Sequence, residues 1–362
     1  MRNKLMAVAT AGVLTLGALG ACTRGDDVAT GRNGTKVGVI LPDTSTSQRW
    51  GSDDPKLLKA AFDAAEVPVD IQNAQGSAET FVAIADRMIA GGAKVLVIAS
   101  LEPVSGKAVL DKARAAGVAT IDYDRLTLNG DADYYVSFDN MQVGRLQGRG
   151  LAKCLKARGI DTPRVAYLNG APTDNNATLF RAGYDSIMQP RFDDGSYLKG
   201  PEQDVPRWDN DLGRFIFDQM LSDSAGRIDG VVAANDGLGN AAITILKRVR
   251  RNGEVPVTGQ DATVQGLQNI LAGDQCMTVY KPIKKEADAA AKLAITLFKD
   301  QAVRVDDRVK DPESGGYVDA VLLPPTAIFK KDIGVVIKDG FVDERTVCAG
   351  AFARLCRRNG IS

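Results

Sequence analysis

The stretch KVLVIASLEPVSGKAVLDKARAAGVATIDYD, residues 94–124, sets the architecture that the sequence predicts. Residues 94–100 form an apolar run, which is typical of a parallel strand that is covered on both faces. The sequence then predicts a helix over 104–115, and the run at 118–124 predicts a second strand. A strand, a helix and a strand in this order indicate two parallel strands joined by a helix that packs on their sheet.

The same alternation extends toward both termini. Residues 36–41 predict another strand, and the apolar residues of 58–65 follow it at the i, i+3, i+4, i+7 spacing of an amphipathic helix. We interpret Asp54, directly before Pro55, as the N-cap of this helix. After residue 140 a second series of alternating strands and helices is predicted. The elements expected there are strands at 164–170, near 196–200, at 229–236, 255–261 and 275–283, and helices over 141–157, about 177–189 and 284–299.

A chain of 362 residues is longer than one typical hydrophobic core requires. We therefore predict an α/β protein with two doubly wound parallel-sheet lobes in series. The last segment is too short for a third domain, so we expect it to complete both lobes by crossing between them.

Composition excludes several classes of function. Lys plus Arg and Asp plus Glu number 45 each, so no net charge favours a nucleic acid or an anionic membrane as partner. The chain has no histidine, which rules out His-based triads, His general bases and His-ligated metals. No phosphate-binding glycine motif follows the first strand. We expect no metal and no cofactor.

The N-terminus predicts export. Residues 1–21 combine two basic residues with an apolar segment too short to span a membrane, as in a signal peptide. The sequence Leu19-Gly20-Ala21-Cys22 resembles the bacterial lipoprotein processing box, so we expect lipidation at Cys22 and a flexible tether over 22–35. The protein would then lie at the extracytoplasmic face of the bacterial cell membrane. The alternative is ordinary signal cleavage beside an incidental cysteine.

Four further cysteines allow three full pairings in an oxidising compartment: Cys154, Cys276, Cys348 and Cys356. Sequence alone does not choose among these pairings. Cys348 and Cys356 are the candidates for a local disulfide, and no CxxC motif is present.

Polar and aromatic residues gather where the predicted strands end. Ligands of open α/β sheets bind beyond these carboxyl ends, where side chains from several strands converge. The candidate binding residues are Arg49, Trp50, Asp124, Arg125, Asp139, Asn140, Asn176, Trp208, Asn235, Asp261 and Lys281. Taken singly, each has a structural explanation as a helix cap, a solvated ion pair or a core residue. Their recurrence in both lobes favours a binding cleft.

The chemistry of these residues suits a carbohydrate. Sugar hydroxyls donate and accept hydrogen bonds, and carboxylates, amides and cationic groups complement them. The apolar C–H faces of a sugar pack on indole rings. Acidic and basic groups are roughly balanced in this set, which favours a neutral ligand.

Nine stretches, taken in order, resemble the periplasmic-binding-protein family of sugar ABC importers. They are QRW (48–50), KVLVIAS (94–100), YDRL (123–126), YVSFDN (135–140), NGAPTDNNATLFRAG (169–183), VVAAND (231–236), VPVTGQDA (255–262), MTVYKPI (277–283) and VIKDGF (336–341). The resemblance implies a type I fold, in which a three-strand hinge joins two lobes that close on one monosaccharide, here D-xylose or a related aldose. The chain departs from the family pattern at Gln48 and in its added cysteines, which leaves the exact sugar open.

The resemblance also implies boundaries and partners. The N-terminal lobe would comprise 36–140 and about 278–325, and the C-terminal lobe 141–277 and about 326–362. The eleven candidate residues would contact the sugar, and the permease of an ABC importer would receive it. We expect a monomer that meets the membrane only through its lipid.

Two other functions share this fold. A sugar-sensing repressor would carry a helix-turn-helix near its N-terminus, where this chain has a signal peptide and Cys22. An exported sugar-acting enzyme would need an acid/base pair, formally Asp124 with Asp261 or Asp236. Nothing else in the sequence supports catalysis, so we predict a binding protein and not an enzyme.

Overall fold

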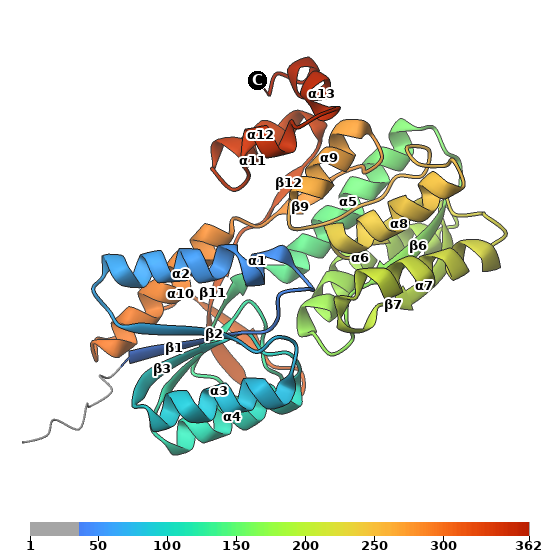
Figure 1. Ribbon diagram of the computed structural model, residues 1–362. Coiled ribbons are helices and arrows are strands. Elements are labelled where there is room, and N and C mark those ends of the chain that lie inside the picture. The colour runs from blue at the N-terminus through green and yellow to red at the C-terminus, as the bar shows by residue number, and fades with distance from the viewer. Residues whose placement is uncertain (1–35, 362) are drawn as a thin grey trace, which may run out of the picture. The chain divides into compact units, whose positions relative to one another are not determined.

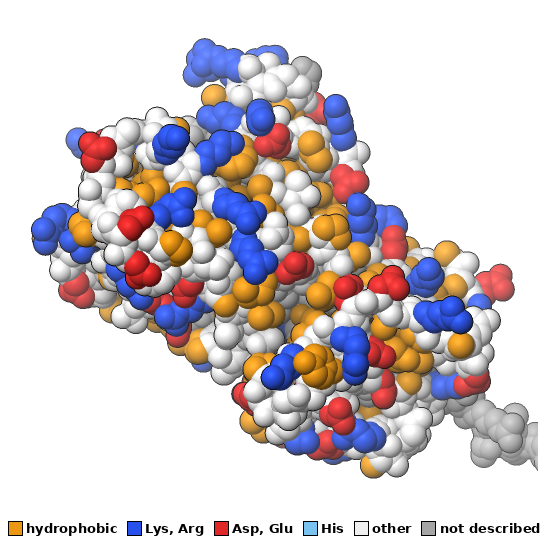
Figure 2. All heavy atoms as spheres, turned by 180° about the vertical axis from the view of Figure 1, so that it is seen from behind, with side chains coloured by type: hydrophobic (Ala, Val, Ile, Leu, Met, Phe, Trp, Pro, Cys, Tyr) orange, Lys and Arg blue, Asp and Glu red, His pale blue; other side chains and the backbone are white. Residues whose placement is uncertain are grey.

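The computed structural model describes residues 36–361. The predicted signal peptide, the lipidation site at Cys22 and the tether all lie outside these described residues. Within 36–361 no helix is long and apolar enough to cross a membrane. Acidic and basic side chains both occur over the face shown in Figure 2, as the equal counts in the sequence suggest.

The first lobe is built on a seven-stranded sheet with the order β10-β11-β5-β4-β3-β1-β2. Its strands are β1 (Lys36–Leu41), β2 (Val69–Asn73), β3 (Ala93–Ile98), β4 (Ala119–Tyr123), β5 (Tyr134–Phe138), β10 (Asp307–Lys310) and β11 (Tyr317–Leu323). All neighbours pair in parallel except β10 and β11, which are antiparallel. The predicted parallel sheet is therefore extended at this edge by one antiparallel strand. A short turn is enough to join antiparallel neighbours, whereas parallel ones need a crossover.

Helices cover both faces of this sheet (Figure 1). On one side lie α3 (Ala78–Ala90) and α4 (Pro103–Ala115); on the other lie α1 (Gln48–Gly51), α2 (Asp53–Ala64) and α10 (Ile283–Phe298). Side chains of β3 alternate between the two cores: Val95 and Val97 join the cluster with α2 and α10, and Leu96 and Ile98 join the cluster with α3 and α4. Coverage of both faces explains why this strand is continuously apolar.

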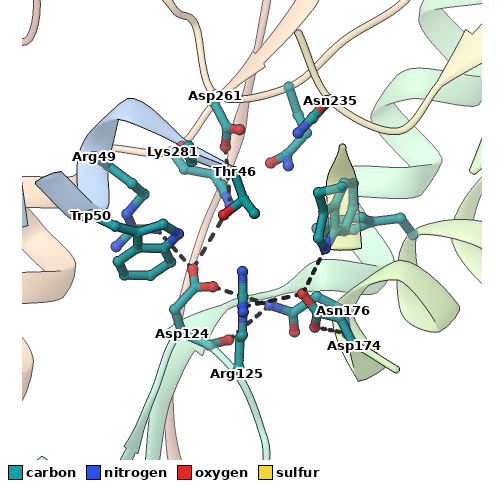
Figure 3. A pocket seen from close by; sticks show the side chains of 14 residues that line it. Thr46, Arg49, Trp50, Asp124, Arg125, Asp174, Asn176, Asn235, Asp261 and Lys281 are labelled. Atoms are coloured by element: carbon teal, nitrogen blue, oxygen red, sulfur yellow. Dashed lines mark hydrogen bonds and ion pairs between the residues drawn. The ribbon is translucent and has the colours of Figure 1, made fainter. Parts of the chain in front are cut away.

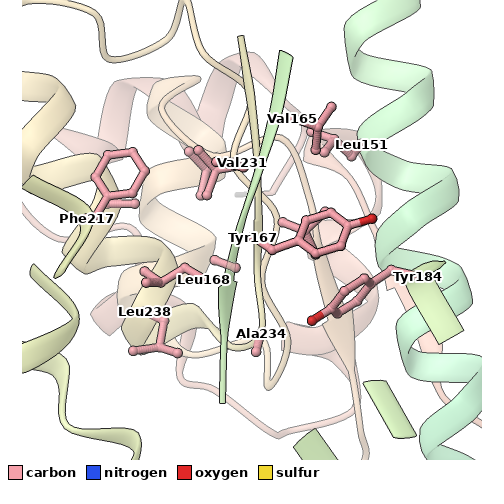
Figure 4. Close-up of a cluster of buried hydrophobic side chains, with 14 of the residues drawn as sticks. Leu151, Val165, Tyr167, Leu168, Tyr184, Phe217, Val231, Ala234 and Leu238 are labelled. Carbon is pink, nitrogen blue, oxygen red and sulfur yellow. The ribbon is translucent and has the colours of Figure 1, made fainter. Parts of the chain in front are cut away.

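The second lobe has a three-stranded parallel sheet in the order β7-β6-β8. Its elements are α5 (Asn140–Ala157), β6 (Arg164–Asn169), α6 (Asn175–Asp193), β7 (Leu198–Asp204), the 3-10 helix η1 (Pro206–Trp208), α7 (Asn210–Asp223), β8 (Gly230–Ala233), α8 (Asp236–Arg248) and α9 (Val264–Ala272). Figure 4 shows how β6 presents side chains on both faces of its sheet, with Tyr167 facing Tyr184 and Leu168 facing Leu238 and Phe217.

Residues 255–261 do not form the predicted strand. Only an isolated bridge joins Val257 to Val231 in β8. Pro256 has no backbone N–H to donate, and Asp261 and Ala262 have positive φ values of 100° and 51°, which end any extended pairing. The segment instead reaches the strand at 278–280, where the Asp261 N–H donates to the carbonyl oxygen of Val279 at 2.8 Å.

Glycine permits the close contact between α5 and α6. A Cβ on Gly144 would stand 2.0 Å from the Phe180 carbonyl oxygen, and one on Gly183 would stand 2.4 Å from that of Met141. The two helices can approach this closely only because both positions lack a side chain.

The chain passes between the lobes three times, after β5, after β9 (Thr278–Tyr280), and between β11 and β12 (Thr326–Ile328). The crossing strands β9 and β12 pair antiparallel with each other. The tail continues through η2 (Lys330–Asp332), α11 (Ile333–Lys338), α12 (Glu344–Val347) and α13 (Phe352–Arg358). The predicted fold class of two α/β lobes with three connections is confirmed.

Two disulfides are present among the described residues. One joins Cys348 to Cys356 in the tail, and the other joins Cys154 in α5 to Cys276, two residues before β9. The structure thereby selects one of the three pairings that the sequence left open.

Candidate functional site

The carboxyl ends of β4, β6 and β8 converge with α1 and β9 on one pocket (Figure 3). It is lined by Thr46, Ser47, Arg49, Trp50, Asp124, Arg125, Asp174, Asn176, Phe180, Trp208, Asn235, Gln260, Asp261 and Lys281. Nine of the eleven predicted residues are among them; Asp139 and Asn140 are not. The pocket draws on both lobes, as the positions of the strand ends predict.

The Arg49 side chain makes more hydrogen bonds than any other side chain that lines the pocket. Its Nε and Nη2 donate to Asp54 at 2.8 and 2.7 Å, its Nη1 donates to Asp124 at 2.8 Å, and Nη2 also donates to Glu286 at 2.6 Å. The guanidinium carbon lies 4.2 Å from the centre of the Trp50 ring. Although burial alone would lower the pKa of Arg49, the surrounding carboxylates raise it well above its usual value. Arg49 therefore stays charged and fixes both Asp124 and Trp50.

Asp124 is held by its backbone as well as by its side chain. It has a positive φ of 63°, a conformation that few residues other than glycine, asparagine and aspartate adopt readily. Its carbonyl oxygen accepts hydrogen bonds from Tyr135 at 3.0 Å, Ser137 at 2.8 Å and Asn176 at 2.9 Å. Burial would raise the pKa of the Asp124 carboxyl, but Arg49 and the other nearby cations outweigh it and hold that pKa below its usual range. The carboxylate is thus a fixed acceptor at the pocket floor.

Lys281 follows the crossing strand β9 and lies between two carboxylates. Its Nζ is 3.3 Å from Asp261 and 3.9 Å from Asp124. Burial lowers the pKa of Lys281, yet Asp261 and Asp124 more than compensate and raise it above its usual value. Lys281 therefore places a permanent cation beside carboxylates from both lobes.

Arg125 and Asp174 meet across the lobes. The Arg125 Nε lies 3.2 Å from Asp174 Oδ2, and the same oxygen accepts a hydrogen bond from Trp208 Nε1 at 3.1 Å. Trp208 fits because position 170 is glycine: a Cβ there would stand 2.0 Å from the indole ring. Asp174 thus fixes an indole in one lobe and a guanidinium from the other.

Asp139 and Asn140 stand behind the pocket and do not line it. Asp139 caps α5 by accepting a hydrogen bond from the Gln142 backbone N–H at 2.9 Å. The Asn140 amide donates to Asn176 Oδ1 at 2.8 Å, and Asn176 in turn donates to Asp124. Asp139 is thus a helix cap and Asn140 supports Asn176, and the contact of these two residues with a sugar stays a prediction.

Several polar atoms remain available to a ligand. Asn235 uses its Oδ1 to cap α8 by accepting from the Leu238 N–H at 2.8 Å, and its amide nitrogen has no partner among the described residues. The buried Gln260 Oε1 likewise has none within 36–361. The lining carries three cations and three carboxylates, so the pocket wall is balanced in charge and suits a neutral, hydroxyl-rich molecule.

Sequence reasoning missed five lining residues: Thr46, Ser47, Asp174, Phe180 and Gln260. Asp174 and Gln260 adjoin predicted strand ends, so their position was a usable signal.

Our interpretation of Asp54 as a helix cap is wrong. The N-cap of α2 is Ser52, and Asp54 is buried against Arg49, with its Oδ1 also accepting from the Tyr123 hydroxyl.

Comparison with known proteins places this chain in a family. A model of the periplasmic binding protein domain matches residues 37–302. The chain is 35% identical over 324 residues to the D-xylose-binding periplasmic protein of Escherichia coli (strain K12), covering 88% of this chain and 94% of that protein. It is 32% identical over 338 residues to the multiple sugar-binding periplasmic protein of Azospirillum brasilense, covering 88% and 94%.

A solved structure of a solute binding protein has a similar fold. The ABC transporter solute binding protein from Clostridium phytofermentans, with bound β-D-glucose, matches with a TM-score of 0.79 and 27% identity over 86% of this chain and 100% of that one. Two α/β lobes with a polar pocket between them, together with these matches, indicate a solute-binding protein. The chain belongs to the periplasmic binding protein family. That family consists of binding proteins and not of enzymes, and we assign no catalytic residue.

Proposed function

We propose that the protein captures a monosaccharide, D-xylose or a related aldose, outside the cytoplasm and delivers it to an ABC importer. The observation that carries the proposal is the balanced pocket wall, with three cations and three carboxylates and an indole from each lobe. Hydroxyls of a sugar can pair with these groups, and its C–H face can pack on Trp50 or Trp208. The names of the relatives add support, because they bind D-xylose, multiple sugars and, in the solved structure, β-D-glucose.

Binding would favour the arrangement in which the lobes are together. Asp124 and Arg125 belong to the first lobe, and Asn235 and Asp261 belong to the second. A sugar that bonds to both sets gains all of its contacts only when the lobes meet, so it shifts the population toward that state. The permease would recognise the same state.

The remaining parts of the proposal concern placement in the cell. We propose that lipid on Cys22 anchors the mature chain and that the chain acts as a monomer. The Leu19-Gly20-Ala21-Cys22 sequence supports the anchor. Replacing Cys22 with Ser should release the protein from the membrane fraction and abolish acyl labelling; unchanged fractionation would contradict the anchor.

Calorimetric titration of residues 36–362 against a panel of monosaccharides tests the ligand. We expect one aldose or a small group of aldoses to bind with a dissociation constant of about 1 μM or less, equivalent to roughly −8 kcal/mol. A sugar acid serves as the charged control and should bind far more weakly, because the lining has no net charge. Failure of every neutral sugar in the panel would contradict the proposal.

A further inference from the structure

Behind the pocket wall lies a buried carboxyl group that the proposed function does not use. Glu286 is in the first turn of α10, fully buried, and does not line the pocket. Its Oε2 accepts a hydrogen bond from Arg49 Nη2 at 2.6 Å, while its Oε1 is buried without a partner among the described residues. A charged oxygen with no donor is costly in such a place.

The surroundings of Glu286 contain more acids than bases. The titratable and charged groups that face it are Arg49 from α1, Asp54 from α2, Tyr123 from β4, Asp124 after β4, Tyr135 from β5 and Lys281 after β9. With Asp261, which pairs with Lys281, this cluster holds four carboxyl groups and only two cations. Arg125 and Asp174 form a separate ion pair, so they do not change the excess of carboxyl groups over cations in this cluster. Full ionisation would leave a buried excess of negative charge.

The contacts show which carboxyl group is least able to ionise. Asp54 accepts from two Arg49 nitrogens and from the Tyr123 hydroxyl. Asp124 accepts from Arg49 and Asn176 and lies near Lys281. Glu286 has a single hydrogen bond for two oxygens. Consistent with this, burial raises the pKa of Glu286 to about 8, although Arg49 opposes the increase.

We propose that Glu286 is a positioning residue that carries a proton at neutral pH and couples sugar affinity to pH through its hydrogen bond with Arg49. The neutral acid orients the Arg49 guanidinium without competing with Asp124 for its charge. A bound sugar expels water from the pocket and so disfavours an ionised Glu286 further. Binding then takes up a proton at alkaline pH, and affinity falls as pH rises through the pKa of Glu286. This inference rests on the proposed function.

A first experiment needs no ligand. The unfolded Glu286 ionises above about pH 4.3, but the folded one does not until about pH 8. Because folding raises the pKa of Glu286, the protonated side chain stabilises the folded state fully below pH 4, and this contribution is lost between pH 4 and 8. The melting temperature of Glu286→Gln minus that of the wild type should therefore rise by at least about 3 °C between pH 4.5 and pH 8. Asp288→Asn, an exposed change on the same helix, should gain nothing. If the melting temperatures of Glu286→Gln and the wild type differed by the same amount at pH 4.5 and at pH 8, the proposal would be overturned.

The second experiment follows sugar affinity. Wild-type affinity should be constant between pH 6 and 7.5 and fall at least about fivefold by pH 9.5, with proton uptake visible in buffers of different ionisation enthalpy. Glu286→Gln should bind within about twofold of the wild type at pH 7 and show no such fall, whereas Glu286→Ala should lose about tenfold or more at every pH. Equal losses in the Gln and Ala variants at pH 7 would show that the ion is needed and would overturn the proposal. If no monosaccharide bound the wild type, the proposed function would fail while the melting experiment still decided the protonation of Glu286.

Discussion

Arg125 of the first lobe and Asp174 of the second form an ion pair across the pocket, with the guanidinium Nε 3.2 Å from the carboxylate oxygen. Asp174 is also the hydrogen-bond acceptor of the Trp208 indole. One carboxylate therefore links a donor from the opposite lobe to an aromatic wall of its own lobe.

Arg125→Ala should weaken sugar binding by about 2 to 4 kcal/mol, which is roughly 30- to 1,000-fold in the dissociation constant. The change removes a charged donor and leaves Asp174 with two neutral donors, the Trp208 indole N–H and the Asn176 backbone N–H. Calorimetry with the best sugar measures the loss. Arg308→Ala removes an exposed arginine paired with Asp319 far from the pocket and should bind as the wild type does. Binding of Arg125→Ala within threefold of the wild type would contradict the assignment.

Asp261→Asn should reduce affinity by a similar factor. Asparagine is the appropriate change because the residue has a positive φ of 100°, which alanine would strain. The substitution removes the closer carboxylate from Lys281, whose Nζ then keeps only Asp124 at 3.9 Å. The melting temperature without sugar should change little, while the stabilisation by sugar should be reduced. A large fall in melting temperature without sugar would favour a structural role for this ion pair.

Gly170→Ala should damage the pocket without touching a polar group. The new Cβ would stand 2.0 to 2.5 Å from three carbon atoms of the Trp208 ring, so the indole must move and its hydrogen bond to Asp174 is lost. We expect at least about tenfold weaker binding. Gly334→Ala is the matched control, because nothing lies within 4 Å of its added Cβ. Equal affinities of the two variants would show that Trp208 is not needed in this position.

The two disulfides should contribute unequally to stability. Cys154 and Cys276 are 122 residues apart, and Cys348 and Cys356 are 8 apart. Loop-closure entropy gives about 5 kcal/mol for the longer loop and about 2.5 kcal/mol for the shorter. Thiol counting under denaturing conditions should find none of these four cysteines free. Double serine variants of each pair, compared by thermal unfolding, should show the larger fall for the first pair; the reverse order would contradict the loop argument.

The sequence was sufficient for most of the fold and for the location of the site. Apolar runs such as 94–100 signal strands buried on both faces, and the polar residues after 119–123 and 230–233 mark the edge where strand ends converge. These are local patterns, and local patterns are readable without coordinates. The antiparallel edge strand β10 and the absence of a regular strand at 255–261 depend on turns and backbone angles that periodicity does not record.

The contacts behind the pocket were not readable in the same way. Asp54 has the sequence context of a helix cap, and Glu286 has that of an ordinary first-turn acid. Both lie against Arg49, from which they are 5 and 237 residues away in the sequence. The pairing arises from packing α2 and α10 on the same face of the sheet, which no spacing rule specifies. Asp139 and Asn140 show that a position at a strand end does not by itself place a residue in the pocket wall: Asp139 caps a helix, and Asn140 bonds to Asn176.

The three hydrogen bonds to the Asp124 carbonyl bear on how this pocket can be redesigned. That peptide group is fixed by donors from Tyr135, Ser137 and Asn176, and its φ of 63° discourages most substitutions. Gln260, in contrast, faces the pocket with a side-chain oxygen that no described residue holds, and its own φ is not positive. Directed evolution toward a different sugar should therefore accept changes at Gln260 readily and reject them at Asp124, so libraries built around position 260 should yield more folded variants than libraries built around position 124.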